Sequence, residues 1–186
     1  MKTVFIRHGL TSGNLEKRYI GTTDEDLCED GINQLKKSDY PKCELLVSSP
    51  MKRCIQTAQI IFHGQEILTY SGLCECDFGD FEGKNYIELS SDADYQKWVD
   101  SGGNLTFPNG EDPMFFRKRC IEAFENIVRR YKDKRSAAFV VHGGTIMSIL
   151  EKYAVPHRDY YEWHCENGGG YICEWDGSKL EVMEKI

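Results

Sequence analysis

Long apolar runs are missing from this 186-residue chain, and none approaches the roughly 20 residues needed to cross a bilayer. The first residues lead straight into a predicted strand, without the longer hydrophobic segment of a secretory signal. Positive charge is also in short supply, because 23 lysines and arginines face 30 aspartates and glutamates, for a net charge of −7. A nucleic-acid-binding protein would favour a basic face. We therefore expect a cytoplasmic protein that binds neither membranes nor nucleic acid.

The eight cysteines lack the paired Cys-x-x-Cys framework of a zinc ribbon. Cys74, Cys76, His164 and Cys165 could be combined into a metal site. Reduced and mostly buried thiols in a cytosolic protein account better for the cysteines, so we expect no metal. Internal repeats, low-complexity tracts and linkers are absent too. The length suits one domain over residues 1–186, with a substantial core.

Strand-like and helix-like segments alternate along the chain. Short apolar runs predict strands at 3–7, 45–49, 66–70, 137–141, 170–175 and 179–183. Helices are predicted at 29–37, 50–61, 86–100, 145–154 and, most clearly, at 113–132, where apolar residues recur every three or four positions. Pro50 is expected to open the second of these helices, since proline suits the first helical turn. The alternation predicts an α/β fold of three layers, with a mostly parallel central sheet and helices on both faces.

The first predicted strand ends abruptly in polar residues. Thr3-Val4-Phe5-Ile6 is an apolar run that stops at Arg7-His8-Gly9. Parallel sheets place their ligands just beyond the carboxyl ends of their strands. An imidazole beside a fixed cation, with a glycine that lets backbone come close, suits an anion such as phosphate. The alternative is a strand that simply ends in polar residues.

The same pattern occurs a second time. Val140-Val141-His142-Gly143-Gly144 again gives an apolar strand followed by histidine and glycine. A lone histidine at a strand end is more often structural. Two such histidines can face one pocket if their strands are neighbours in a parallel sheet. The repetition therefore favours a functional site over two structural histidines.

With these motifs in place, the chain resembles the histidine phosphatase superfamily, also called the phosphoglycerate mutase-like family, over nearly its whole length. The matching residues occur in the family's order, as Arg7-His8-Gly9 with Thr11 and Asn14; Gly21, Leu27, Gly31 and Gln34; Ser48-Ser49-Pro50 with Arg53, Gln56, Thr57 and Ala58; Leu73, Glu75, Phe78-Gly79 and Glu82-Gly83; and His142-Gly143. Two positions depart from the pattern. Leu10 stands where many relatives have glutamate. Cys28 stands where Thr or Ser usually caps the following helix, and because a thiol is a poor cap the loss of stability should be about 1 kcal/mol.

The resemblance implies how the phosphoryl group is handled. His8 would be the nucleophile that attacks phosphorus. Arg7, Arg53 and His142 would stabilise the charge spread over the phosphoryl oxygens in the transition state. Asn14, Gly21 and Gly143 would belong to the substrate-binding set, in which the Gly143 backbone is a donor.

Glu75 would be the proton donor to the leaving alkoxide, and then the base for the water that hydrolyses phosphohistidine. Both tasks require a carboxyl pKa raised towards neutrality, which partial burial near Phe78 and Phe81 could provide. The resemblance implies no metal or other cofactor, because the arginines supply the positive charge. His63 and His157 are expected at the surface, and His164 near the rim of the site.

The family includes mutases and phosphatases, and this compact chain looks like the phosphatase branch. It would be a metal-independent phosphomonoester hydrolase, acting through phosphohistidine on a small phosphorylated metabolite. A variable, substrate-facing segment is expected at about 72–112. Within the branch, Trp98, Pro108-Asn109-Gly110-Glu111 and Arg119 are similar to the members that hydrolyse α-ribazole phosphate in cobalamin assembly. Phosphoglycerate mutase-type transfer and a non-catalytic phospho-ligand-binding protein are the alternatives.

Overall fold

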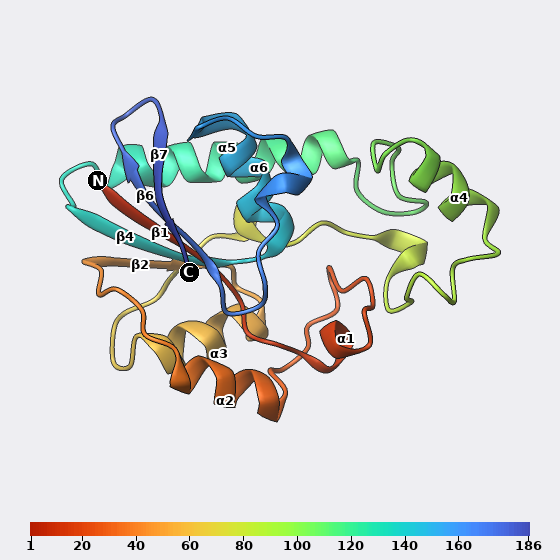
Figure 1. The fold of residues 1–186 in the computed structure, drawn as a ribbon, viewed down its shortest axis with the longest axis horizontal. Helices are drawn as coiled ribbons and strands as arrows, with labels where there is room; N and C mark the ends of the chain where they lie inside the picture. The colour runs from red at the N-terminus through yellow and green to blue at the C-terminus, as the bar shows by residue number, and fades with distance from the viewer.

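A seven-stranded sheet forms the centre of the computed structural model, which describes all residues 1–186 (Figure 1). Its strands in chain order are β1 (Lys2–Arg7), β2 (Leu45–Ser48), β3 (Leu68–Thr69), β4 (Ser136–Val141), β5 (Ala154–Val155), β6 (Gly170–Trp175) and β7 (Leu180–Lys185). Their spatial order is β3-β2-β4-β1-β6-β7-β5. The pairs β3-β2, β2-β4, β4-β1 and β7-β5 are parallel, whereas β6 runs antiparallel to both of its neighbours. The prediction of a mostly parallel sheet is confirmed.

Helices cover both faces of this sheet, as predicted. In Figure 1, α2 (Glu29–Lys37) and α3 (Lys52–Ile61) lie on one side, and α5 (Pro113–Arg130) and α6 (Gly143–Tyr153) on the other. The short α1 (Ser12–Leu15) and α4 (Ala93–Asp100) lie beyond the end of the sheet to which β1 points. Three single-turn 3₁₀ segments, η1 (Ser71–Leu73), η2 (Gly79–Phe81) and η3 (Tyr160–Trp163), complete the chain. None of the helices is long and apolar enough to span a membrane.

The strand β1 is buried on both of its faces. Its Phe5 side chain packs with Phe124 and Phe139 in the core beneath α5 and α6. Val4 and Ile6 point to the opposite core, beneath α3. Successive side chains of a strand alternate between its faces, so a strand covered on both faces is apolar at every position. This explains why the run 3–6 is continuous in the sequence.

Several predicted boundaries were wrong, each for a local reason. Pro50 does not open α3, because the helix begins at Lys52 and Met51 is its N-cap residue. The predicted helix at 86–100 begins only at Ala93, where the Asp92 carboxylate accepts hydrogen bonds from the next turn. The helix predicted at 145–154 begins earlier, at Gly143, because His142 is the N-cap residue of α6.

The remaining predictions concern one short strand, one helix cap and the cysteines. The strand predicted at 66–70 is reduced to Leu68–Thr69. The predicted poor cap of α2 is confirmed, because the Cys28 side chain makes no capping hydrogen bond. All eight cysteines are free thiols, and five of them are buried. The elements α1, β5 and η3 were not predicted.

We expect Phe124→Ala to destabilise the fold by about 3–5 kcal/mol, because its ring is fully buried among Phe5, Phe139 and Trp175. Phe115→Ala is the matched control on the same helix, since 69% of Phe115 is exposed, and should change stability by no more than about 0.5 kcal/mol. Urea unfolding measures both. Equal shifts in the two variants would contradict the position of the core.

Candidate active site

The two strand-end histidines lie side by side at the carboxyl edge of the sheet. In the parallel pair β1-β4, Arg7 is opposite Val141, so the residues that follow, His8 and His142, leave the sheet at the same level. Their ring centroids are 5.3 Å apart, and both side chains are buried. The structure therefore brings together the two repeated motifs that the sequence placed 134 residues apart (142 − 8 = 134).

The His8 ring is held in one orientation. Its Nδ1 lies 2.8 Å from the carbonyl oxygen of Gly9, to which a neutral ring donates Nδ1–H, while Nε2 makes no hydrogen bond within the protein. Burial, with the charges of Arg53 and Arg7, holds the pKa of His8 well below its ordinary value of 6.5. The surrounding backbone is fixed as well, because Asn167 Nδ2 donates to the His8 carbonyl at 3.0 Å. A neutral imidazole with an available Nε2 can act as a nucleophile.

Two guanidinium groups, one buried and one half-buried, lie next to this imidazole. Arg53 is fully buried, and it donates to the carbonyls of Thr23 at 2.7 Å and Gly21 at 2.8 Å. Arg7 donates to the carbonyl of Cys165 at 2.7 Å. The Nε of each arginine is buried and has no acceptor in the protein. Because buried donors without acceptors are costly, and both groups are cationic, they suit the oxygens of an anion.

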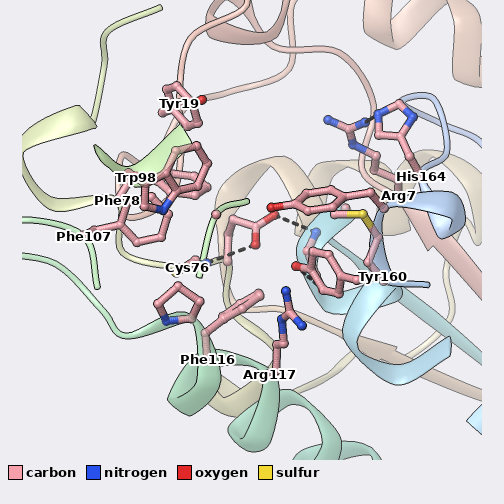
Figure 2. Close-up of a pocket in the computed structure, with 17 residues that line it drawn as sticks. Arg7, Tyr19, Cys76, Phe78, Trp98, Phe107, Phe116, Arg117, Tyr160 and His164 are labelled. Atoms are coloured by element: carbon pink, nitrogen blue, oxygen red, sulfur yellow. Dashed lines mark hydrogen bonds between the residues drawn. The ribbon is translucent and has the colours of Figure 1, made fainter. Parts of the chain in front are cut away.

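The carboxyl group of Glu75 is held by backbone N–H groups. Cys76 N donates to Oε1 at 3.0 Å (the dashed line beside Cys76 in Figure 2), and Gly144 N donates to Oε2 at 3.2 Å. Burial raises the pKa of Glu75 above its ordinary value of 4.5, against these hydrogen bonds and the charges of Arg53 and Arg7. Phe78 lines the surrounding pocket as expected, whereas Phe81 does not line it and packs behind the lining residues Trp98 and Phe107.

His142 is the N-cap residue of α6, and its Nε2 lies 2.8 Å from Ser49 Oγ. Burial and the charge of Arg53 lower its pKa well below 6.5, so this ring too is neutral at neutral pH. Gly143 follows with no side chain, and a Cβ there would lie 3.4 Å from Arg7 Nε. The backbone at the start of α6 therefore closely approaches the Arg7 guanidinium.

Asn14 and Gly21 lie outside the pocket lining. Asn14 Oδ1 accepts from Asn167 Nδ2 at 3.0 Å, and the same amide group of Asn167 donates to the His8 carbonyl. Gly21 shapes the loop beneath Arg53, since its carbonyl accepts from that arginine and a Cβ would lie 1.9 Å from the Cys76 carbonyl oxygen. In this structure, the Gly21 backbone binds the Arg53 guanidinium group and does not line the pocket.

A pocket of about 230 Å³ adjoins this cluster, although His8, Arg53 and His142 are not among its lining residues. Arg7, Glu75 and Gly143 line one part of it, and aromatic side chains form much of the remaining wall (Figure 2). These aromatic residues are Tyr19, Phe78, Trp98, Phe107, Phe116, Tyr160 and Tyr161. His164 also lines the pocket, and its Nε2 lies 3.3 Å from Arg7 Nη1. His63 and His157 are exposed.

Part of the pocket wall was not predicted from the sequence. Tyr160 and Tyr161 come from η3, which has no periodic pattern, and Phe116 was read only as a core residue of its helix. Arg117 lies with its Cζ 3.8 Å from the Tyr160 ring centroid, and it pairs with Glu151 at 3.3 Å. Nothing in the spacing of these residues indicates that they meet, because three separate elements contribute them.

The family model of the histidine phosphatase superfamily (branch 1) matches residues 3–185, and the chain belongs to this superfamily. It is a phosphatase of that class, and named phosphatases are among its relatives. It is 25% identical over 177 residues to the adenosylcobalamin/alpha-ribazole phosphatase of Salmonella typhimurium, covering 90% of this chain and 87% of the relative. It is 32% identical over 160 residues to phosphoglycerate mutase-like protein 4 of Arabidopsis thaliana, covering 80% and 69%.

Solved structures share the fold. The alpha-ribazole phosphatase from Shigella flexneri matches with a TM-score of 0.88 at 21% identity, over 98% of this chain and 95% of that one. Phosphoglycerate mutase from Thermus thermophilus matches with a TM-score of 0.78 at 24% identity, over 100% and 98%. Because one fold serves both named activities, the fold does not separate them.

We expect Arg53→Met to weaken the binding of inorganic phosphate roughly 10- to 100-fold, because hydrogen bonds to a charged group contribute about 1.5–3 kcal/mol. Isothermal titration calorimetry measures this change. Arg129→Met is the control, since Arg129 is exposed on α5 and should leave phosphate binding unchanged. Circular dichroism checks that both variants are folded. Unchanged binding by a folded Arg53→Met protein would exclude the proposed anion site.

Proposed function

We propose that this phosphatase hydrolyses phosphomonoesters without a metal ion, and that His8 carries the phosphoryl group between the two steps. The observation that carries the proposal is the environment of His8. Its neutral ring keeps Nε2 available, and the adjacent Arg7 and Arg53 each have a buried Nε–H without an acceptor. A nucleophile is thereby combined with fixed donors for an anion.

In the first step, the lone pair of His8 Nε2 attacks phosphorus and the bond from phosphorus to the ester oxygen breaks. The carboxyl proton of Glu75 passes to that leaving oxygen, which departs as a neutral alcohol. Arg7, Arg53 and His142 donate hydrogen bonds to the phosphoryl oxygens, with Asn14 and the Gly143 backbone as further donors. These interactions are strongest when charge has spread over the oxygens in the transition state.

In the second step, the Glu75 carboxylate removes a proton from water, and the water oxygen attacks phosphorus. The bond from phosphorus to His8 Nε2 breaks, inorganic phosphate leaves, and Glu75 is protonated again for the next cycle. A carboxyl group that serves first as acid and then as base requires a pKa nearer the working pH than that of a free glutamate. The raised pKa of Glu75 supports this assignment.

The pocket wall supports a leaving group with a flat, largely apolar body. Aromatic rings stack on such groups, and the indole N–H of Trp98 is buried without an acceptor, so it could bind an acceptor atom of the substrate. α-Ribazole phosphate, the ester suggested by the names of two relatives, has this character. The segment 72–112, which contributes Cys76, Phe78, Trp98, Gly103 and Phe107, would set the specificity.

A mutase acting on phosphoglycerates would also need to bind the substrate carboxylate. Besides Arg7, the cationic residue in the pocket lining is Arg117, which already pairs with Glu151 and stacks on Tyr160. This arrangement favours hydrolysis over phosphoryl transfer to a sugar acid. A small phosphorylated metabolite as substrate and eight free thiols also suit a cytoplasmic enzyme.

We expect acid quenching during turnover of ³²P-labelled substrate to trap phosphohistidine on His8, and His8→Ala to abolish both the label and phosphate release. Excess EDTA should leave the rate unchanged. Efficient turnover without any label on His8 would exclude the covalent route. Isomerisation of 3-phosphoglycerate faster than its hydrolysis would favour a mutase, and phosphate binding without turnover of any ester would favour a binding protein.

The pKa shifts predict a pH window for kcat/KM with an alkyl phosphomonoester. His8 must be neutral, and its lowered pKa keeps the acid limb below pH 6.5. Glu75 must be protonated, and its raised pKa places the alkaline limb above pH 4.5. Glu75→Gln should remove the alkaline limb, lower the plateau and leave the acid limb in place. An alkaline limb that persists in Glu75→Gln would assign the proton donor to another group.

A further inference from the structure

A partly buried ion pair stands behind Glu75, outside the pocket lining. Arg119 of α5 and Glu111 form two parallel hydrogen bonds, from Nε to Oε1 at 2.7 Å and from Nη2 to Oε2 at 2.9 Å. The two side chains are 29% and 20% exposed. A guanidinium group held by both oxygens of a carboxylate has a fixed orientation, and its remaining N–H groups point in fixed directions.

Those remaining N–H groups bind the backbone that carries Glu75. Arg119 Nη1 donates to the carbonyls of Gly72 at 3.1 Å and Cys74 at 2.7 Å, and Nη2 donates to the carbonyl of Glu75 at 2.8 Å. Glu111 binds the other side of the segment, because its backbone N–H donates to the Asp77 carbonyl at 2.9 Å. The pair therefore holds the chain before, at and after Glu75.

The segment between η1 and η2 has no regular secondary structure of its own. Its position consequently depends on side chains from elsewhere, and Arg119 supplies three of the hydrogen bonds to the carbonyls in and next to it. Arg119 does not line the pocket, and its Nε, Nη1 and Nη2 already donate to Glu111 and to backbone carbonyls. Its charge is matched by Glu111 and the carbonyl oxygens.

We propose that Glu111 and Arg119 are positioning residues that keep the Glu75 carboxyl group at the leaving oxygen of the substrate. This inference rests on the proposed role of Glu75 as proton donor. Misplacement of a reacting group by about 1 Å can cost roughly 100-fold in rate. Loss of the pair should therefore slow proton donation in particular, and leave the attack by His8 nearly intact.

Leaving-group chemistry separates positioning from a general structural role. The p-nitrophenolate ion departs without a proton, whereas an alkoxide requires one. For Arg119→Met we expect kcat/KM to fall roughly 100-fold with 2-phenylethyl phosphate and by less than about threefold with p-nitrophenyl phosphate. Arg119→Lys should recover part of the loss, because lysine can bind carbonyls but cannot form the paired contact with Glu111.

Lys118→Met is the matched control on the same helix, since Lys118 is exposed and pairs only with Glu122, and it should change the rate with neither substrate. Equal losses on both substrates in Arg119→Met would overturn the proposal. If Arg119→Met fails to fold, Arg119→Lys and Glu111→Gln are measured instead, and each must show a larger loss with the alkyl ester for the proposal to stand.

A double-mutant cycle distinguishes this inference from the proposed function itself. Glu75→Gln should show the same dependence on the leaving group, and adding Arg119→Met to it should cause no further loss with 2-phenylethyl phosphate. If Glu75→Gln treats the two esters alike, the proton-donor role fails. If Glu75→Gln separates the esters and Arg119→Met does not, only the positioning role fails.

Discussion

Parallel hydrogen bonding between β1 and β4 fixes the register in which Arg7 lies opposite Val141, and the rest of the site is arranged around that register. It brings His8 and His142 to the same edge of the sheet, and it lets α6 begin directly after His142. The N–H group of Gly144 in that first turn then donates to the Glu75 carboxyl group. A shift of one residue would turn every β1 side chain to the opposite face, so the buried core on both sides of β1 enforces the geometry of the site.

The same arrangement has a cost in stability, which a bound anion would offset. Two guanidinium groups and two imidazoles are crowded together, and burial lowers the pKa of both His8 and His142. Below pH 6.5 the unfolded chain therefore binds protons that the folded chain rejects, so these histidines reduce stability as the pH falls. The raised pKa of Glu75 acts in the opposite sense, because stability is lost as the pH rises above 4.5. A bound phosphate group would compensate the excess positive charge.

Sequence patterns revealed the parts of the molecule that depend on local order. The strand ends at His8 and His142 were predictable, because a buried parallel strand is a continuous apolar run and its carboxyl end is where ligands bind. The long, periodic α5 was predictable for a similar reason. The contact of Tyr160 with Arg117 was not, because it depends on how η3 packs against a helix some forty residues earlier (160 − 117 = 43). The mistaken start of α3 at Pro50 shows that a residue suited to a helix start need not occupy it.

The five residues assigned to phosphoryl transfer differ in how they are anchored. Arg7 ends β1 and His8 follows it directly, Arg53 lies within α3, and His142 caps α6, so regular backbone hydrogen bonding fixes four of them. Glu75 alone comes from a segment without regular structure. Such a segment can vary with the substrate, but a proton donor must be placed as accurately as the nucleophile. Side-chain hydrogen bonds from Arg119 provide for Glu75 the constraint that the sheet and helices provide for the other four. In the proposed mechanism, the nucleophile and the proton donor would therefore both be fixed, although only one of them lies next to a strand of the sheet.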